Sequence, residues 1–547
     1  SMKKYIKNIL PAAALLLSMG LSSCVGDLDV TPIDPNKNTK ANPDQLFTKC
    51  YADLALAGQS GPDGDCDIDG LDGGTTGFVR QLFNTNELPT DEAICNWGDP
   101  GIAEFNYISF DSNHPMAKGF YYRLYFGVTI CNQYLATFAK VDETKTAEVR
   151  FLRALNYYYL MDLYGNVPFT EQISAAAAPQ YTRKQLYDYI EKELLEIEPK
   201  LSAATPKKST EAGYGRVDKA AAWMLLARLY LNAQVYTGTA QWQKAAEYAK
   251  KVMDSNYKLY TGATKNGWTA YQQLFMGDNG ENGASVEAIF PVLQDGKKTA
   301  SYGTTLFLTA STFDAGVIVN SNGTAGNNTS ENWAGNRARK SLVDKFFPNN
   351  NAPYVHANQM TAAAGDDRAL FDALQADGNK RNIDQANADQ VGVFSNGFAV
   401  AKFTNFHSDG SAGHDAKYPD TDFFLMRVAE AYLTYAEATA RLNGNQTTTE
   451  GTAAINALHK RAHAQERTGG SYTLDDILDE WSREFYFEGR RRSDLIRFGR
   501  FGGNNNYTWP WKGGVHEGTQ VSATKNIYAI PTNDKNVNPN IKQNPGY

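Results

Sequence analysis

Residues 217–233 read VDKAAAWMLLARLYLNA, and this stretch decides the fold. Its apolar residues recur at helical spacing, and Asp218 stands near the start, where a side chain can cap the first turn. The alanines let a neighbouring helix approach closely, and the larger side chains fill the gap beside it. The stretch EAYLTYAEA at 430–438 has the same mixture of small and large residues. Both stretches predict buried helices that pack against partner helices.

Other segments also have helical periodicity. They are residues 121–138, 144–164, 183–201, 241–255, 423–442, 451–465 and 474–497. Short turns separate several of them into pairs, which resemble degenerate tetratricopeptide units. Between the pairs, residues 58–115 and 261–422 are rich in Gly, Asn, Ser and Asp, and long irregular stretches of this kind are usually functional. We therefore predict a mainly α-helical protein with large loop-rich insertions, in which residues 44–547 form a single body.

Composition limits the function. The chain has 547 residues with 53 Lys plus Arg and 60 Asp plus Glu, which gives a formal charge of 53 − 60 = −7. This weakly acidic balance argues against a duplex nucleic-acid binder, because phosphate contacts need clustered cations. Apolar residues make up 42% and charged residues 21% of the chain, which is typical of a soluble globular protein and not of a disordered one.

The N-terminus has the features of a lipoprotein signal. Ser1 precedes Met2 and is interpreted as a cloning remnant. Three lysines, an apolar run too short to span a bilayer, and Leu-Ser-Ser-Cys at 21–24 then follow. We expect a signal peptide over residues 1–23, with Cys24 acylated and anchored in a membrane through its lipid chains. Residues 24–43 are mostly polar and rich in proline, which predicts a flexible tether. An ordinary secretory signal with an incidental cysteine is the alternative.

No catalytic motif stands out. GxSxG, HExxH, GxxxxGK[ST] and GxGxxG are all missing from the sequence. His459 and His463 have metal-ligand spacing on a predicted helix, but no further ligand lies suitably near in sequence, so two surface histidines are the simpler interpretation. The acidic run 63–72 fits an EF-hand loop from Asp65 until position 12, where Thr76 replaces the required carboxylate.

Three further patterns have structural interpretations. Acidic residues surround Arg490-Arg491-Arg492, which predicts an ion-paired helix and not a nucleic-acid patch. The Trp509-Pro510-Trp511 run is expected to serve packing. Besides Cys24 the chain has Cys50, Cys66, Cys95 and Cys131, whose spacing matches no metal or redox motif and leaves one disulfide bridge open.

Several motifs together resemble the SusD/RagB family. They are the lipobox, the 217–233 helix, EAYLTYAEA, WSREFYFEGRRRSDLIRFGRF at 481–501 and YAIPTNDKNVNPNIKQNPGY at 528–547. NELPTDE at 86–92, DGLDGGTTGFVR at 69–80 and YPDTD at 418–422 are most similar to the starch-binding members. The resemblance implies a surface lipoprotein of a Gram-negative outer membrane. Such a protein binds glycan without hydrolysing it and delivers it to a TonB-dependent, SusC-like transporter.

The resemblance also implies binding residues. Trp97, Tyr302 and Trp333 match the aromatic rings that stack on glucose, and Asp72 and Arg80 match the polar residues that hydrogen-bond its hydroxyls. Flat rings suit the apolar C–H faces of a sugar, and a curved set of rings suits the curvature of an α-1,4-glucan.

Two positions depart from the family pattern. A second Trp is expected where this chain has Cys95, and an Asn is expected at Pro100, where the neighbouring Asp99 is the polar candidate. The arc of rings is therefore expected to be shallower, or the ligand to differ.

Other implications remain open. No cofactor is required, but Asp278, Asp420 and Asp422 offer oxygen ligands for a structural calcium ion. An acidic surface loop is the alternative. Competing functions are a lid of the same fold that binds another glycan or a peptide, and a surface glycoside hydrolase.

Overall fold

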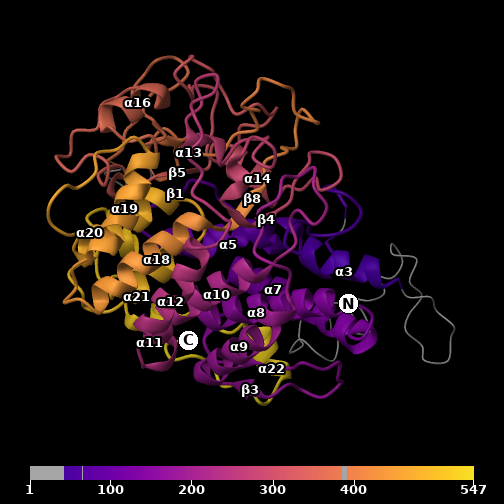
Figure 1. Cartoon of the computed structure of the whole chain (residues 1–547). Coiled ribbons are helices and arrows are strands. Elements are labelled where there is room, and N and C mark those ends of the chain that lie inside the picture. Colours follow the sequence, from indigo (N-terminus) through magenta and orange to yellow (C-terminus); the bar gives the residue numbers. More distant parts are fainter. Residues whose placement is uncertain (1–41, 65, 385–390) are drawn as a thin grey trace.

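The computed structural model describes residues 42–64, 66–384 and 391–547. The expected signal peptide, Cys24 and nearly all of the tether lie outside the described residues. Figure 1 shows long helices in one half of the molecule and a loop-rich half, with α13, α14 and α16, above them. The mainly α-helical prediction is confirmed, and the tetratricopeptide-like character of the helix pairs stays a prediction.

The N-terminal helices follow their capping signals. They are α3 (Pro43–Ala52), α7 (Pro115–Phe138), α8 (Glu143–Tyr164) and α9 (Arg183–Ile197). Helix α7 begins six residues before the predicted start, because His114 caps it and proline is favoured at the first helical position. Asp142 caps α8, and Gly165, with φ of 75°, ends it as predicted. Helices α7, α8 and α9 pack against one another in sequence order.

The two signature stretches lie on either side of one helix. The residues 217–233 give α10 (Lys219–Leu231) and the short α11 (Ala233–Thr237), and EAYLTYAEA lies in α18 (Val428–Arg441). Both α10 and α18 pack against α12 (Trp242–Met253), and α18 also packs against α19 (Thr449–Arg461). The alanines of α10 and α18 are almost fully buried, so the close helix packing predicted from them is present.

Two predicted helices are shorter than expected. Residues 423–427 form strand β8 (Phe423–Arg427), which pairs antiparallel with β4 (Ala288–Val292), so the prediction of one helix over 423–442 is wrong at its start. All five residues of β8 are buried, and a short continuous apolar run cannot be told from a helix by periodicity. The segment 474–497 is two helices, α20 (Leu474–Phe485) and α21 (Arg491–Arg497). Phe487 and Gly489 have positive φ and interrupt the helix.

The arginine triplet is ion-paired, as predicted. Arg490 pairs with Asp494, Arg491 with Asp91 at 2.8 Å, and Arg492 with Asp162. Asp91 belongs to the NELPTDE segment, and Glu87 in the same segment accepts hydrogen bonds from the backbone N–H groups of Gly489 and Arg490. Two motifs about 400 residues apart therefore form one buried contact.

A second buried charge network joins β8, α19 and α20. Glu484 pairs with Arg427 at 2.7 Å and with Arg461 at 2.8 Å, and Arg368 also contacts it. All four side chains are fully buried. Buried charges are tolerated only when they are paired in this way.

The remaining elements are short. The helices are α4 (Gly73–Thr76), α5 (Phe78–Glu87), α6 (Ile102–Tyr107), α13 (Ala270–Gln273), α14 (Thr305–Ala310), α15 (Lys340–Val343), α16 (Ala357–Ala364), α22 (Thr532–Val537) and the single turns η1 (Glu198–Lys200), η2 (Ala284–Val286), η3 (Lys512–Gly514) and η4 (Ala523–Asn526). The strand pairs are β1 (Ala93–Cys95) with β5 (Asn336–Ala338), β2 (Val167–Pro168) with β3 (Gln180–Tyr181), and β6 (Phe371–Asp372) with β7 (Ala399–Val400). Residues 58–115 thus contain more helix than their composition indicates.

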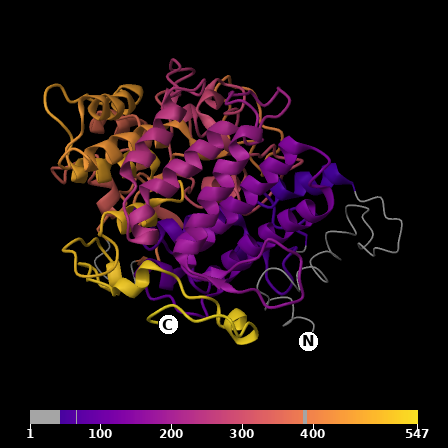
Figure 2. The ribbon, with the colours of Figure 1, turned by 60° about the horizontal axis from the view of Figure 1, so that its bottom comes forward.

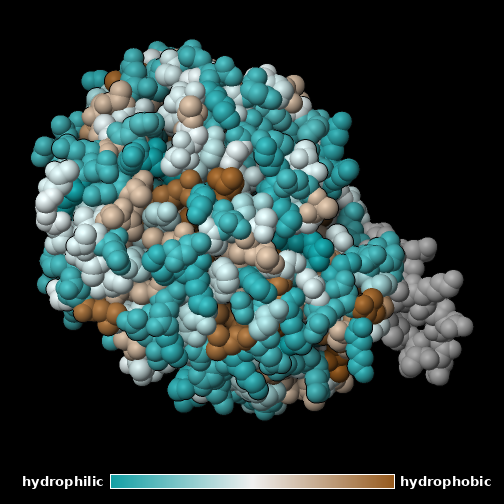
Figure 3. Space-filling model, viewed as in Figure 1, coloured by the Kyte–Doolittle hydropathy of each residue, from teal (hydrophilic) through white to brown (hydrophobic). Residues whose placement is uncertain are grey.

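The C-terminal segment, which contains Tyr528, packs against the helices. In Figure 2 it runs along the lower edge of the helices, and the Tyr528 backbone N–H donates to the Leu163 carbonyl at 2.7 Å. Trp509 and Trp511 are buried, which confirms their packing role. Among the described helices, none has the length and apolarity needed to cross a membrane. The face in Figure 3 is mainly hydrophilic, with apolar residues in small separate patches.

Candidate functional site

The strand pair β1–β5 brings Trp97 and Trp333 together. Cys95 at the end of β1 lies opposite Asn336 at the start of β5 in the antiparallel register. The Asn96 N–H donates to the Gly335 carbonyl at 3.2 Å and extends the pairing by one step. Trp97 comes just after the paired residues of one chain segment, and Trp333 comes just before those of the other. Because the strands are antiparallel, the two indoles lie at the same end of the pair. Their ring centroids are 6.4 Å apart and their planes are inclined by 59°.

The Trp97 indole is fixed by the opposing chain. Its Nε1 donates to the Trp333 carbonyl at 3.0 Å. The ring lies against the backbone of Gly335, where an added Cβ would come within 2.2 Å of Trp97 Cε2. Phe307 packs edge-on at 6.3 Å. Because the indole N–H is already bonded within the protein, the ring can offer a ligand only an apolar face.

Tyr302 extends the two indoles into a row of three rings. Its centroid lies 6.3 Å from that of Trp333, and the two planes differ by 34°. All three rings are half-buried. We call Trp97, Trp333 and Tyr302 the ring arc. Its planes turn from one ring to the next, so the arc presents a bent surface and not a flat one.

Arg80 lies behind the arc. It is in the first turn of α5, where its N–H donates to the Gly303 carbonyl at 3.0 Å, next to Tyr302. The approach is close, because a Cβ on Gly77 would meet Gly303 Cα at 3.3 Å, a tight contact. The guanidinium carbon lies 5.7 Å from the Trp97 ring centroid and 5.1 Å from that of Phe307.

The Arg80 guanidinium has spare donors. Among the described residues its Nε is buried without a hydrogen-bond partner. Asp99 is the charged partner within range, at 3.9 Å from Nη2. Burial lowers the pKa of Arg80, while Asp99 and Asp72 act to raise it. Nε is closed off from solvent, so the part of Arg80 that a ligand oxygen can reach is the 13% of the side chain that is exposed.

Asp72 and Asp99 complete the predicted set at its exposed edge. Asp72 caps α4 and accepts a hydrogen bond from Thr75 N at 2.8 Å. Both carboxylates are exposed. The structure therefore gathers all six predicted residues around one surface: apolar ring faces in the middle, a guanidinium behind them and carboxylates at the edge. Such a surface can stack on a pyranose and hydrogen-bond its hydroxyls.

The departures from the family pattern have defined positions. Cys95 is 2% exposed, beneath the arc, and its backbone N–H and carbonyl are both hydrogen-bonded to Asn106. Burial raises the pKa of its thiol to about 12. Pro100 is exposed next to Asp99, ahead of α6. Cys95 thus adds no ring face, and the shallower arc or different ligand expected from the sequence stays a prediction.

Several residues of the site carry no recognisable signal in the sequence. They are Asp63, Phe307, Glu331, Gly335 and Lys417. Asp63, Phe307 and Lys417 contact a ring from a segment far away in the chain. Gly335 acts through the lack of a side chain, and Glu331 pairs with Lys417. Only the strand pairing and the loop contacts identify them.

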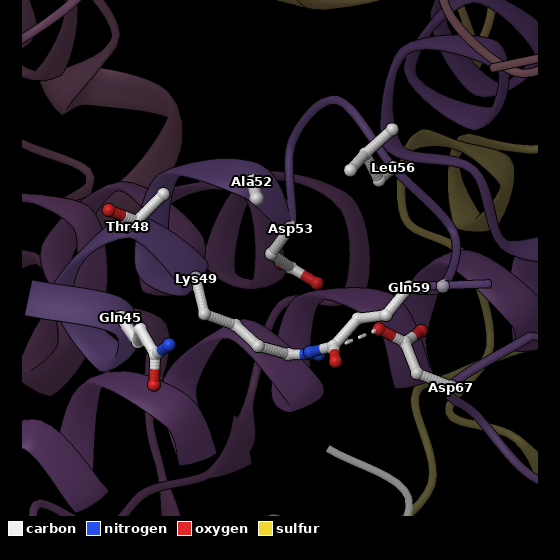
Figure 4. A pocket seen from close by; sticks show the side chains of 9 residues that line it. Gln45, Thr48, Lys49, Ala52, Asp53, Leu56, Gln59 and Asp67 are labelled. Carbon is white, nitrogen blue, oxygen red and sulfur yellow. Dashed lines mark ion pairs between the residues drawn. The ribbon is translucent and has the colours of Figure 1, made fainter. Parts of the chain in front are cut away.

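A buried charge cluster anchors the loop that carries Asp63 and Asp72. Asp67 in this loop pairs with Lys49 of α3 at 3.6 Å and with Arg123 of α7 at 2.9 Å. Figure 4 shows the Lys49–Asp67 pair across a cavity of about 170 Å³ that α3 and the loop enclose. The cluster holds one edge of the site against the helical scaffold.

The residues proposed for calcium bind protein donors instead. Asp420 accepts from His407 Nε2 at 3.0 Å and from His414 Nδ1 at 2.8 Å. Asp422 accepts from Tyr214 Oη at 2.6 Å, and Asp278 accepts from Ser408 Oγ at 2.7 Å. In the part of the chain that the structure describes, no three His, Cys, Asp or Glu side chains are grouped to hold a metal ion.

Burial raises the pKa of Asp422 to about 7. A bound cation would itself lower this pKa, so the calcium site expected from the sequence stays a prediction.

The other singled-out residues have structural contacts. His459 bonds Glu480, and His463 bonds Asp367, so the two imidazoles do not converge on one point. Cys50, Cys66, Cys95 and Cys131 are free thiols in this structure. Asp65, at the start of the rejected EF-hand match, lies outside the described residues.

Comparisons with known proteins agree with these observations. The SusD family model matches residues 228–547, and a SusD-like model described as starch-binding and associating with the outer membrane matches residues 104–231. The chain is 41% identical to the starch-binding protein SusD of Bacteroides thetaiotaomicron, over 100% of this chain and 99% of that protein.

Solved structures share the fold. A SusD superfamily protein from Parabacteroides distasonis aligns with a TM-score of 0.65 and 20% identity, over 92% of this chain and 98% of that one. Surface glycan-binding protein A of Bacteroides thetaiotaomicron, solved with laminarihexaose, aligns with a TM-score of 0.63 and 21% identity over the same shares. Two of these relatives are named as a starch-binding and a glycan-binding protein. With a family model across more than half of its length and a full-length relative at 41% identity, this chain belongs to the SusD family.

Proposed function

We propose that this protein is a cell-surface lipoprotein that binds starch and maltooligosaccharides. The observation that carries the proposal is the ring arc with Arg80 behind it. The three rings are half-buried, and the polar atoms of Trp97 and Tyr302 are bonded within the protein, which leaves apolar ring faces for successive glucose units. The change of plane from ring to ring, 59° and then 34°, favours a curved chain over a flat one. The full-length relative named as starch-binding supports this choice of glycan.

The site is suited to capture and release. Open, partly hydrated binding surfaces give modest affinity, because much of the contact energy offsets the entropy that the ligand loses on binding. Modest affinity fits a protein that passes its ligand on. We propose that the recipient is a TonB-dependent, SusC-like transporter in the outer membrane, and that acylated Cys24 holds the protein at the cell surface beside it. Purification of the tagged protein from its native membrane with such a transporter attached would support this step.

Calorimetry on a triple variant tests the site. The full chain, purified in mild detergent, is titrated with maltoheptaose before and after Trp97→Ala, Trp333→Ala and Tyr302→Ala are combined. We expect at least a hundredfold loss of affinity, about 2.7 kcal/mol, because each ring contributes apolar contact area. Circular dichroism checks that the variant is folded. Unchanged affinity in a folded triple variant would show that the ligand binds elsewhere.

A different glycan is the second candidate. The related fold solved with laminarihexaose shows that this scaffold can carry a β-glucan site in another protein. Titration with laminarihexaose alongside maltoheptaose separates the two. Binding of laminarihexaose alone would assign the arc to a β-glucan, and binding of neither would favour a peptide-binding lid.

A further inference from the structure

The Tyr302 hydroxyl is fully engaged inside the protein. It accepts a hydrogen bond from Lys417 Nζ at 2.6 Å and donates one to Asp63 Oδ1 at 2.9 Å. A phenol has one proton to donate, and that proton is committed to Asp63. Tyr302 therefore presents its ring, and not its hydroxyl proton, to a ligand.

Lys417 also reaches the segment that carries Trp333. Its Nζ lies 3.3 Å from Glu331 Oε1, two residues before Trp333. The backbones of the two segments are joined next to this ion pair, where Ser330 N donates to the Ala416 carbonyl at 2.8 Å. One ammonium group thus connects Tyr302 with the Trp333 segment.

The loop around Lys417 is itself ordered by local contacts. Asp415 Oδ1 accepts from the backbone N–H groups of Lys417 at 2.7 Å and Tyr418 at 3.0 Å. The Tyr418 ring meets Tyr302 edge-on, with centroids 5.5 Å apart and planes at 69°. The hydrogen bond with Tyr302 raises the pKa of Lys417, so the ammonium stays charged. Tyr302 is therefore held at its hydroxyl end and along one edge.

We propose that Lys417 is a positioning residue for glycan binding, which fixes Tyr302 relative to Trp333 with Tyr418 as the edge support. This inference rests on the proposed function of the ring arc and adds a residue that never touches the sugar. It makes a specific prediction. Removing the Tyr302 hydroxyl breaks its contacts with both Lys417 and Asp63, so its effect on binding should be smaller once Lys417 is gone.

A double-mutant cycle tests the coupling. The full chain and its Lys417→Met, Tyr302→Phe and double variants are titrated with maltoheptaose. We expect each single change to raise Kd about three- to tenfold, and the double variant to lose less affinity than the two single effects multiplied, because contacting residues are non-additive. Lys417→Arg should restore most of the affinity. Lys297→Met removes an exposed lysine of the neighbouring loop and should leave Kd unchanged. Single effects that multiply in the double variant would overturn the proposal.

A measurement without glycan separates this inference from the proposed function. Hydrogen–deuterium exchange is followed in peptides that cover residues 298–304. Exchange should speed up in Lys417→Met and stay unchanged in Lys297→Met. If the native protein binds no α-glucan but this exchange pattern appears, the proposed function fails and the positioning contact stands. If Lys417→Met alters neither exchange nor affinity, the positioning contact is wrong.

Discussion

At the scale of single residues, the position of the Trp97 indole depends on Gly335 having no side chain. The indole lies against the Gly335 backbone, where a Cβ would come within 2.2 Å of the ring. Real Cβ atoms do not approach so closely, so Gly335→Ala must push the indole out of line with Trp333. We expect at least a tenfold loss of maltoheptaose affinity, about 1.4 kcal/mol, with a small change in Tm. Calorimetry and tryptophan fluorescence measure both effects.

A nearby glycine provides the control. An added Cβ on Gly98, next to Trp97, meets no atom within 4 Å. Gly98→Ala should leave affinity and fluorescence as they are. Equal affinity in the Gly335 and Gly98 variants would contradict the role assigned to the Trp97 ring.

Some residues around the ring arc could be predicted from the sequence, and others could not. Trp97, Tyr302 and Trp333 carry recognisable motifs, and the structure places them side by side. Gly335 and Lys417 carry no such signal. Gly335 matters only because β5 lies beside β1, and Lys417 only because its loop reaches Tyr302, 115 residues earlier in the chain.

At the scale of elements, periodicity identified the helices and missed the breaks in them. The start of 423–442 is a strand, because β4 offers an antiparallel partner for five buried residues that read equally well as a helix. The 474–497 helix is broken where Phe487 and Gly489 turn the chain so that Glu87 can accept the freed N–H groups. Both outcomes depend on distant partners that no local pattern contains.

The charge network between β8, α19 and α20 makes a stability prediction. Glu484→Gln removes one of the two carboxylates that Arg427 and Arg461 share in a fully buried site and leaves Glu287 as the other. Breaking a buried pair on one side costs about 3–5 kcal/mol, and urea unfolding should show a loss of this size. The control is Asp475→Asn, which removes an exposed partner of Arg500 and should cost at most about 1 kcal/mol. Similar losses in both variants would contradict this assignment.

The same substitution has a defined pH dependence. Burial alone would raise the pKa of Glu484, but Arg461, Arg427 and Arg368 outweigh it and lower the pKa from 4.5 to about 2. A lowered carboxyl pKa contributes stability above the unfolded value and loses it as pH falls toward the folded value. The difference between the native protein and Glu484→Gln should therefore shrink from about pH 4.5 toward pH 2.

At the scale of the whole molecule, helices provide the rigid half and loops provide the site. Helix α5 contributes Arg80, the β1–β5 pair contributes the two indoles, and loops contribute Tyr302 and Lys417. These parts come from positions 80 to 417 of the chain, so the site exists only in the folded protein. This division explains why the fold class could be predicted from helical periodicity, whereas the site residues required a resemblance to known proteins.

We propose that the ring arc recognises a curved α-glucan. Affinity electrophoresis of the native protein in gels with amylopectin, dextran, a β-glucan or no glycan tests it most directly. Retardation in the amylopectin gel alone is the predicted result, because only that polymer offers long α-1,4-linked chains of the right curvature. Migration that is the same in the amylopectin gel and the glycan-free gel would contradict the claim.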